Sequence, residues 1–309
     1  MRRADKVIIS CAVTGSIHTP SMSPHLPVSA DDIAAQAIGA AEAGAAILHL
    51  HARETGTGRP TQSIAEYEKF LPVIRDNCDA IINITTGAGL GMTMDERLAA
   101  ANHFKPEIAS MNMGSLNFNI SGAAKRGGFE HDWERPYLEM TTDFILSNTF
   151  KQIERAITDL TAHGTRFEFE CYDVSHLYNL AHFADRGMIK PPFFVQSIFG
   201  ILGGIGPDPE NLMHMKSIAD KLFGNDYYLS VLAAGRHQFP FVTMGAIMGG
   251  NVRVGLEDNL YLSKGELAEN NAALVAKIKH ILEQLSLRVA TPDEAREMLG
   301  TKGANLVGF

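Results

Sequence analysis

Residues 45–53 read AAILHLHAR, and this short run decides how the rest of the chain is interpreted. Its apolar beginning predicts a buried strand. Because side chains on a strand alternate between two faces, His49 and His51 point the same way. Two imidazoles about 7 Å apart on one strand face can share a metal ion. The alternative is a pair of hydrogen-bonded core histidines. A loop with Glu54 and Gly56 follows, so the pair lies at the C-terminal end of the strand, where α/β proteins build their sites.

The composition is that of an ordinary globular protein. The chain has 309 residues, of which 45% are hydrophobic and 20% charged, and its net charge is −8 with a pI near 5.8. Lysines and arginines are scattered, which argues against a nucleic-acid interface. The first apolar run, residues 7–13, is too short to span a membrane. The cysteines form no CxxC pair, which favours reduced thiols. We therefore expect a cytoplasmic protein that binds neither nucleic acid nor membrane.

Short β-rich runs alternate with longer helical patterns along the whole chain. Eight strands are predicted, at residues 7–14, 45–52, 80–86, 108–113, 166–172, 192–198, 227–233 and 251–256. Each is followed by a helical segment, and eight such βα units indicate one (β/α)8 TIM barrel that spans residues 1–309. The main alternative, a doubly wound sheet, usually carries GxGxxG after its first strand, and here that strand ends in Thr14-Gly15-Ser16.

The helix predictions depend on caps and breakers. Ser29 stands as an N-cap before an Ala-rich helix, and residues 61–76 are expected to form one helix with a kink at Pro72. A long final helix is expected at residues 264–286. Between the fourth strand and its helix, residues 114–148 are expected to form a long loop that acts as a lid or binding loop.

A site can be assembled from the strand ends alone, because all C-terminal strand ends of a barrel meet on one face. The eighth strand leads into Glu257 and Asp258, and in a closed barrel it lies close to the second strand with His49 and His51. Two imidazoles and one carboxylate leave a metal ion with an open position, as in catalytic zinc sites. We predict Glu257 as the third ligand and Asp258 as an acid or base. The alternative for these acidic residues is a solvated turn.

Further polar residues at strand ends are predicted to bind substrate: Arg53, Thr85, Thr86, Gly87, Ser110 and Asn112. The Gly-rich turn at residues 87–91 offers backbone N–H groups for a carboxylate or oxyanion, and its alternative is a plain turn. Arg253, within the eighth strand, needs a partner when buried. That partner is Asp258, a substrate carboxylate or a structural ion pair.

Four stretches, taken in order, resemble one known family. They are HLHAR at 49–53, TTGAGLGM at 85–92, GRHQ at 235–238 and MGGNVRVGLEDN at 248–259. This combination resembles the β-keto acid cleavage enzymes, and the likeness covers nearly the whole chain. The resemblance implies a zinc-dependent TIM barrel that forms a homo-oligomer, a tetramer. It also implies condensation of a β-keto acid with acetyl-CoA, which gives acetoacetate and a new acyl-CoA.

The resemblance assigns roles by position. His49, His51 and Glu257 match the metal ligands of the family, and Arg253 and Asp258 match its catalytic pair.

Other matched positions lie near the substrate. Thr85 stands where the best-known member has a serine, which gives Thr85 a catalytic place, and Ser110 stands where that member has a threonine. An acidic residue that holds an amino group there is replaced by Ile17, which favours a neutral or anionic substrate. The loop at residues 114–148 has no counterpart of that length and is expected to reshape the pocket.

The expected reaction uses the metal as a Lewis acid on the keto and carboxylate oxygens, with the Asp258–Arg253 pair as the base. The enolate attacks the acetyl thioester, and a retro-Claisen cleavage releases acetoacetate. Arg236 and His237 are expected to contact CoA, together with the loop at residues 200–207. One alternative is a metal-dependent retro-aldolase or lyase that acts on a keto or hydroxy acid without CoA. Another is a non-catalytic binding protein, and the same ligands suit manganese or cobalt.

Overall fold

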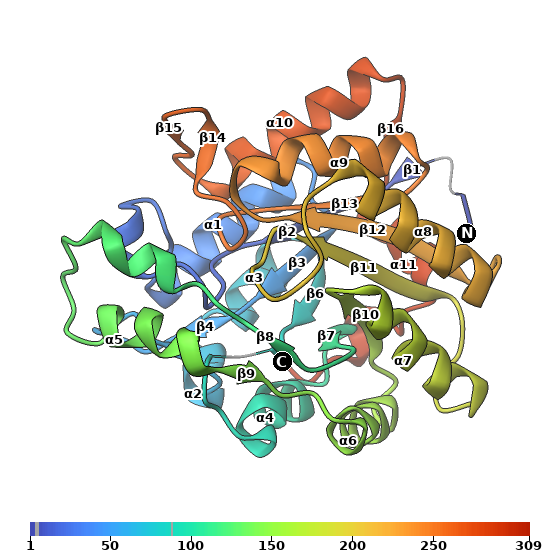
Figure 1. Ribbon diagram of the computed structural model, residues 1–309, viewed down its shortest axis with the longest axis horizontal. Helices are drawn as coiled ribbons and strands as arrows, with labels where there is room; N and C mark the ends of the chain where they lie inside the picture. The colour runs from blue at the N-terminus through green and yellow to red at the C-terminus, as the bar shows by residue number, and fades with distance from the viewer. Residues whose placement is uncertain (4–5, 88) are drawn as a thin grey trace.

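Eight parallel strands close into a barrel in the computed structural model, which describes residues 1–3, 6–87 and 89–309 (Figure 1). In chain order the barrel strands are β2 (Ile9–Ala12), β3 (Ile47–Leu50), β6 (Ile81–Ile84), β7 (Ile108–Asn112), β10 (Arg166–Cys171), β11 (Phe193–Phe199), β12 (Tyr227–Ala233) and β13 (Asn251–Val254). The ring closes where β13 pairs in parallel with β2. The predicted TIM barrel is therefore confirmed.

The barrel interior changes from apolar to polar along the strands. Buried apolar side chains fill its N-terminal end: Ile8, Ile47, Ile81, Ile108 and Phe194. Two positions further along each of four of these strands, the side chains are polar and almost fully buried: His49, Asn83, Ser110 and Gln196. Residues two apart on a strand share a face, so the apolar layer supports a polar layer above it. The C-terminal half of the barrel thus has a polar lining.

Helices surround the barrel and bury its outer face. They are α1 (Ala30–Ala43), α2 (Ile64–Glu68), α3 (Leu71–Asn77), α4 (Met94–Phe104), α5 (Glu134–Glu139), α6 (Phe150–Thr161), α7 (Val174–Asp185), α8 (Pro209–Phe223), α9 (Gln238–Ile247), α10 (Asn271–Gln284) and α11 (Pro292–Leu299). The predicted cap of α1 is confirmed, because the Ser29 side chain accepts a hydrogen bond from the Asp32 amide. Within the described residues, none of these helices is long and apolar enough to cross a bilayer.

Two helix predictions are wrong in detail. Residues 61–76 contain two helices, α2 and α3, because Pro72 lacks an amide hydrogen and stands in the first turn of α3. The helix expected from residue 264 begins seven residues later, at α10. A hairpin comes first, formed by β14 (Tyr261–Ser263) and β15 (Glu266–Leu267), with Lys264 and Gly265 in its turn.

The segment between β7 and α6, residues 113–149, is folded instead of forming an open loop. It contains a small antiparallel pair, β8 (Leu116–Asn117) and β9 (Ile145–Leu146), together with α5. In Figure 1, α5 and the β14–β15 hairpin lie on the same side of the barrel, away from the N-terminus. The Tyr137 hydroxyl donates to the Ser16 carbonyl at 2.9 Å, and the Trp133 indole donates to the Thr57 carbonyl at 3.0 Å. The segment is therefore a tethered wall beside the mouth of the barrel.

Two further small strand pairs lie outside the barrel. Near the N-terminal end of the barrel, β1 (Lys6–Val7) pairs in parallel with β16 (Arg288–Val289). Directly after β3, β4 (Ala52–Arg53) pairs with β5 (Pro60–Thr61) in the antiparallel sense. The second pair holds Arg53 beside the C-terminal end of β3.

Candidate metal centre and active site

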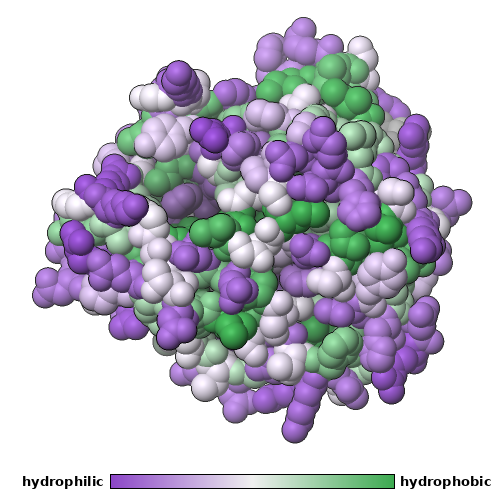
Figure 2. Space-filling view, viewed as in Figure 1, coloured by the Kyte–Doolittle hydropathy of each residue, from purple (hydrophilic) through white to green (hydrophobic). Residues whose placement is uncertain are grey.

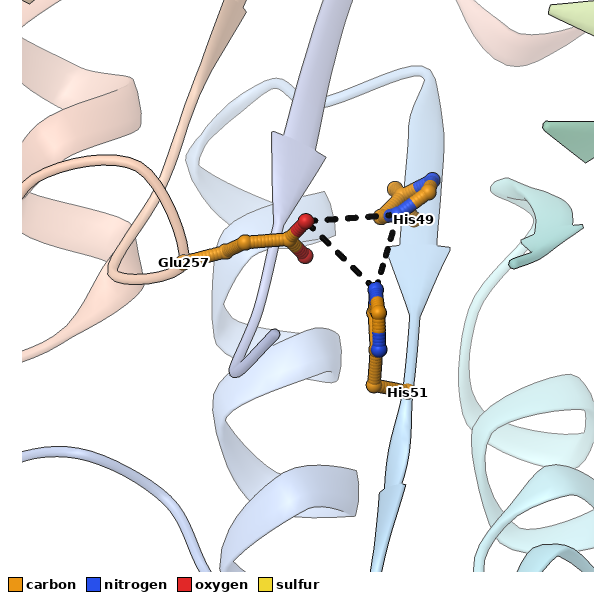
Figure 3. Close-up of side chains that lie close together, drawn as sticks. All are labelled: His49, His51 and Glu257. Atoms are coloured by element: carbon orange, nitrogen blue, oxygen red, sulfur yellow. Dashed lines mark hydrogen bonds and ion pairs between the residues drawn. The ribbon is translucent and has the colours of Figure 1, made fainter. Parts of the chain in front are cut away.

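Three side chains converge at the C-terminal end of the barrel (Figure 3). His49 lies in β3, His51 directly follows it, and Glu257 follows β13. The two Nε2 atoms are 3.3 Å apart. Glu257 Oε1 lies 3.5 Å from Nε2 of His49 and 3.4 Å from Nε2 of His51. The predicted convergence of these three residues, from strand ends on either side of β2, is thus seen in the structure.

The triangle has the dimensions of a metal site. Three ligands at about 2.1 Å from one tetrahedral ion lie about 3.4 Å from one another. Glu257 Oε2 has no hydrogen-bond partner among the described residues, although it is buried. Burial lowers the pKa of His49, which favours the neutral imidazole that binds metals. Although burial raises the pKa of Glu257, the neighbouring His51, His49 and Arg253 hold it well below its usual range. The donor set therefore fits a divalent cation.

A buried cluster of charges surrounds Arg253, beneath this triangle. Its guanidinium contacts four buried carboxylates, those of Glu168, Glu170, Glu257 and Asp258, at N–O distances of 2.8–3.2 Å. The contact with Asp258 is bidentate, through Nε at 3.1 Å and Nη2 at 3.2 Å. One guanidinium cannot neutralise four carboxylates, and unbalanced buried charge is costly. A divalent cation and one bound proton would balance the cluster.

Two of these carboxyl groups are poised to carry a proton. Burial raises the pKa of Glu170 to about 8, and the Arg253 charge opposes that rise. Burial also raises the pKa of Asp258 to about 7, again against the effect of Arg253. A carboxyl group with a pKa near neutrality can both accept and return a proton, as a general base requires. Asp258 lines the larger of two cavities at the mouth of the barrel, directly beside Glu257.

The two cavities differ in size. The inner cavity, of about 50 Å³, is lined by the candidate metal ligands and by Thr85, Gly87, Asn112 and Glu170, among others. The outer cavity, of about 540 Å³, reaches from Arg253 and Asp258 to the loops after β11 and β12. Both cavities are lined by Ile17, Tyr172 and Glu257, so they adjoin. In the space-filling view, hydrophobic residues gather around the centre of the face shown, and hydrophilic residues are denser at its periphery (Figure 2).

Several residues predicted to bind substrate lie elsewhere. The Thr86 hydroxyl donates to the Ser110 carbonyl at 2.7 Å and lines neither cavity. Its neighbour Thr85 faces the inner cavity, because adjacent residues in an extended chain point to opposite sides. Ser110 is buried below the cavities, opposite Glu168 in the sheet register. Ala88, part of the turn predicted to supply backbone donors, lies outside the described residues.

Arg53 is buried and engaged with the backbone. Its guanidinium donates to the carbonyl oxygens of Thr14, Gly15, His18 and Gly58 and to the Thr14 hydroxyl, at 2.7–3.0 Å. All three guanidinium nitrogens are thus occupied by protein atoms, so the structure places Arg53 in a supporting position and not on a substrate.

The loop that Arg53 holds touches a candidate metal ligand. Gly15 has φ +65°, and a Cβ there would lie 2.3 Å from Cγ of Glu257. The hydrogen bond from Arg53 to the Gly15 carbonyl therefore fixes this glycine in close contact with the Glu257 side chain.

The two residues predicted to contact CoA also differ from each other. Arg236 is exposed and lines a third cavity, beside the β14–β15 hairpin. His237 is half-buried, and its Nε2 accepts a hydrogen bond from Nε of Arg236 at 3.3 Å. It lines neither of the two cavities at the barrel mouth.

Sequence reasoning missed Glu168 and Glu170. Both lie on β10, in the run Arg166–Cys171, and both are buried. The available signal was the alternation Glu-Phe-Glu, which places two carboxylates on one face of a strand whose intervening phenylalanine faces the helices. In a barrel, the polar face of such a strand has to point inward, toward Arg253.

Comparisons with known proteins agree with this geometry. A family model described as beta-keto acid cleavage enzyme matches residues 6–301. The chain is 57% identical to 3,5-dioxohexanoate:acetyl-CoA acetone transferase of Paraburkholderia graminis, over 98% of both chains. It is 35% identical to 3-keto-5-aminohexanoate cleavage enzyme of Acetoanaerobium sticklandii, over 96% of this chain and 98% of that one.

A solved structure supports the fold. The binary complex of ObcA with oxaloacetate matches with a TM-score of 0.65 and 20% identity, over 90% of this chain and 68% of that one. At this identity the likeness concerns the barrel alone. The family match and the relatives in sequence together cover nearly the whole chain. The chain therefore belongs to the β-keto acid cleavage enzyme family, acyltransferases that cleave a carbon–carbon bond of a β-keto acid with acetyl-CoA as co-substrate.

Proposed function

We propose that the β-keto acid cleaved by this enzyme has a short, uncharged acyl chain, and that it is 3,5-dioxohexanoate. The observation that carries this proposal is an apolar wall of the inner cavity, formed by Ile17, Leu90, Phe118 and Leu146. The 57% identity to an enzyme named for that substrate supports the same choice.

The charges around the inner cavity also favour a neutral acyl chain. The carboxylates that line it belong to Glu170 and Glu257, and both already contact Arg253. Glu257 is also a proposed metal ligand, so neither carboxylate is left to hold a cationic chain. An anionic chain would find no lysine or arginine among the described residues that line this cavity. The acetonyl group of 3,5-dioxohexanoate carries no charge and fits an apolar wall.

We infer that the metal is Zn²⁺, held by His49, His51 and Glu257. Two imidazoles and one carboxylate are a zinc donor set with an open position. When bound, the ion would supply Lewis-acid polarisation of the keto and carboxylate oxygens of the substrate. The residues that line the inner cavity would then orient the substrate, with Asn112 and the Thr85 hydroxyl as hydrogen-bonding groups.

Asp258 is the proposed base. It removes a proton from the carbon between the keto and carboxylate groups, and its bidentate contact with Arg253 fixes the orientation of the carboxylate. The resulting carbanion carbon attacks the carbonyl carbon of acetyl-CoA, which forms a new C–C bond and expels the CoA thiolate. Arg253 remains buried against Asp258 throughout and balances its negative charge.

The thiolate then attacks the original keto carbon of the condensed intermediate. The bond between that carbon and the former α-carbon breaks, and the electron pair returns to the α-carbon, which takes back the proton from Asp258. The products are acetoacetate and the CoA thioester of the acyl chain. With 3,5-dioxohexanoate, that thioester is acetoacetyl-CoA.

A panel of β-keto acids tests the proposal. The purified enzyme is given acetyl-CoA with 3,5-dioxohexanoate, with cationic 3-keto-5-aminohexanoate, or with dianionic 3-oxoadipate, and both products are measured. We expect kcat/KM for 3,5-dioxohexanoate to exceed the other values at least tenfold. A preference for a charged substrate would refute the assignment. Cleavage that proceeds equally well without acetyl-CoA would instead indicate a lyase.

A further inference from the structure

A third cavity, of about 680 Å³, lies beyond the proposed active site, between α9, α10 and the β14–β15 hairpin. The hairpin is inserted between β13 and α10, and Lys264 stands in its turn. In Figure 1 the hairpin projects outward above the barrel strands. This cavity is separate from the cluster around Arg253, so the proposed chemistry does not account for it.

The lining of this cavity is basic and aromatic. Arg236, Lys264 and Lys277 line it, and none of the described lining residues is acidic, although the chain has a net charge of −8. Phe239 and Tyr261 contribute aromatic surface, and the Tyr261 side chain is 42% exposed. Lys277 Nζ lies 4.2 Å from the centre of the Phe239 ring. Cations beside exposed aromatic rings suit a ligand that combines phosphates with a base.

The cavity adjoins the outer active-site cavity. Gly235 lines both the outer active-site cavity and this basic cavity. After β13, consecutive residues also line the two cavities: Asp258 lines the outer active-site cavity and Asn259 lines the basic cavity. The Gly235 amide donates to the Asp258 carbonyl at 2.8 Å, which joins the two strand ends. A long, thin ligand could therefore reach Asp258 with one end while the other end lies among the basic residues.

We propose that the basic cavity binds the phosphorylated nucleotide end of acetyl-CoA. Its phosphates contact Lys264 and Arg236, its adenine packs on Tyr261, and its pantetheine arm passes Gly235 toward Asp258. This inference rests on the proposed function, since it needs a CoA thioester at Asp258.

The other basic residues at the mouth are less suited to this role. Lys125 also lines the outer cavity, but its neighbour Arg126 is not available to a phosphate, because it already donates to the Met22 carbonyl at 2.7 Å. Aromatic rings that could stack on a base are also fewer there, because the adjoining residues of that segment are Ser121, Gly122 and Ala123. The β14–β15 side therefore offers the better match to a nucleotide.

Truncated donors separate the nucleotide from the thioester. We would measure steady-state rates with acetyl-CoA and with S-acetylpantetheine, which lacks the nucleotide, for the wild type, Lys264→Glu, Arg236→Glu and Tyr261→Ala. The matched control is Lys279→Glu, because Lys279 lies on the same helix as Lys277 but lines a cavity near Gly44, at the N-terminal end of the barrel. All substituted side chains except Lys279 are exposed, so the variants should fold.

We expect KM for acetyl-CoA to rise about tenfold in Lys264→Glu, while KM for S-acetylpantetheine and kcat change less than twofold. Lys279→Glu should match the wild type with both donors. Equal effects on both donors, or a wild-type KM for acetyl-CoA in Lys264→Glu, Arg236→Glu and Tyr261→Ala, would overturn the proposal. If the wild type formed no acetoacetate from any donor, the proposed function would fail. Calorimetric binding of CoA to the same variants would then decide the cavity separately, and equal affinities in wild type and variants would refute it.

Discussion

At the scale of single residues, the strongest expectation concerns the triangle of His49, His51 and Glu257. His49→Ala and Glu257→Gln should each lower the bound metal, measured by elemental analysis, to a small fraction of the wild-type content. Activity should fall at least a thousandfold, because Lewis-acid stabilisation contributes several kcal/mol to the barrier. His103→Ala is the control, because that histidine is on α4 with a half-exposed side chain. Full activity in a metal-free variant would contradict the assignment.

Asp258 permits a sharper separation of binding from chemistry. Asp258→Asn keeps the shape of the side chain and can still accept a hydrogen bond from Arg253, but it cannot take a proton. We expect kcat to fall by about 10²–10⁴, the usual effect of a lost general base, while metal content and KM stay near wild type. Asp226→Asn, on the exposed surface, should have no effect. A kcat within threefold of wild type would place the base elsewhere.

The sequence allowed these residues to be predicted because strand geometry is simple. Period-two alternation places His49 and His51 on one face, and barrel closure brings Glu257 to them. Arg53 was harder to predict, since an arginine on the site-facing side of a strand can bind either a substrate or a backbone loop. Only the observed partners, the carbonyl oxygens of Thr14, Gly15, His18 and Gly58, decide between the two.

At the scale of elements, Arg53 connects the β4–β5 pair to the loop after β2. Arg53→Met would leave several buried carbonyl groups unpaired, which costs on the order of 3 kcal/mol of unfolding free energy. Gly15 would also lose its fixed position against Glu257, so metal affinity should fall. Denaturant unfolding and metal titration measure the two effects. Arg59→Met is the matched control, because Arg59 lies between β4 and β5 and its side chain is exposed. Equal behaviour of the two variants would count against a supporting role for Arg53.

The elements themselves were predicted with uneven success, for physical reasons. Strands of a parallel barrel are buried on both faces, so their continuous apolar runs stand out in the sequence. The β14–β15 hairpin was hidden, because Tyr261–Ser263 is short and half-exposed and runs into a strong helical pattern. The short elements of residues 113–149 were hidden for a related reason. They are held by contacts with distant loops, such as that of Tyr137 with Ser16, and not by local periodicity.

At the scale of the whole molecule, metal binding should be linked to stability. The cluster around Arg253 joins β3, β10 and β13, no two of which are adjacent in the barrel. A ligand that binds only the folded state stabilises it by about 4 kcal/mol when its free concentration is 1,000 times its Kd. We expect a chelator to lower Tm by several degrees and added Zn²⁺ to restore it, as followed by calorimetry. Glu257→Gln should be insensitive to both treatments; an unchanged wild-type Tm would argue against the metal site.

The position of the inner cavity behind the outer one imposes an order on substrate binding and product release. The inner cavity of about 50 Å³ adjoins the outer one of about 540 Å³, through which acetyl-CoA has to approach Asp258. Acetyl-CoA that binds first in the outer cavity would block access to the inner cavity, so the keto acid has to bind before it. High acetyl-CoA should therefore inhibit turnover in competition with the keto acid, which initial-rate kinetics at varied concentrations of both would reveal. By the same reasoning the acyl-CoA product leaves before acetoacetate. The expected kinetic mechanism is therefore ordered, with the keto acid binding first and acetoacetate leaving last.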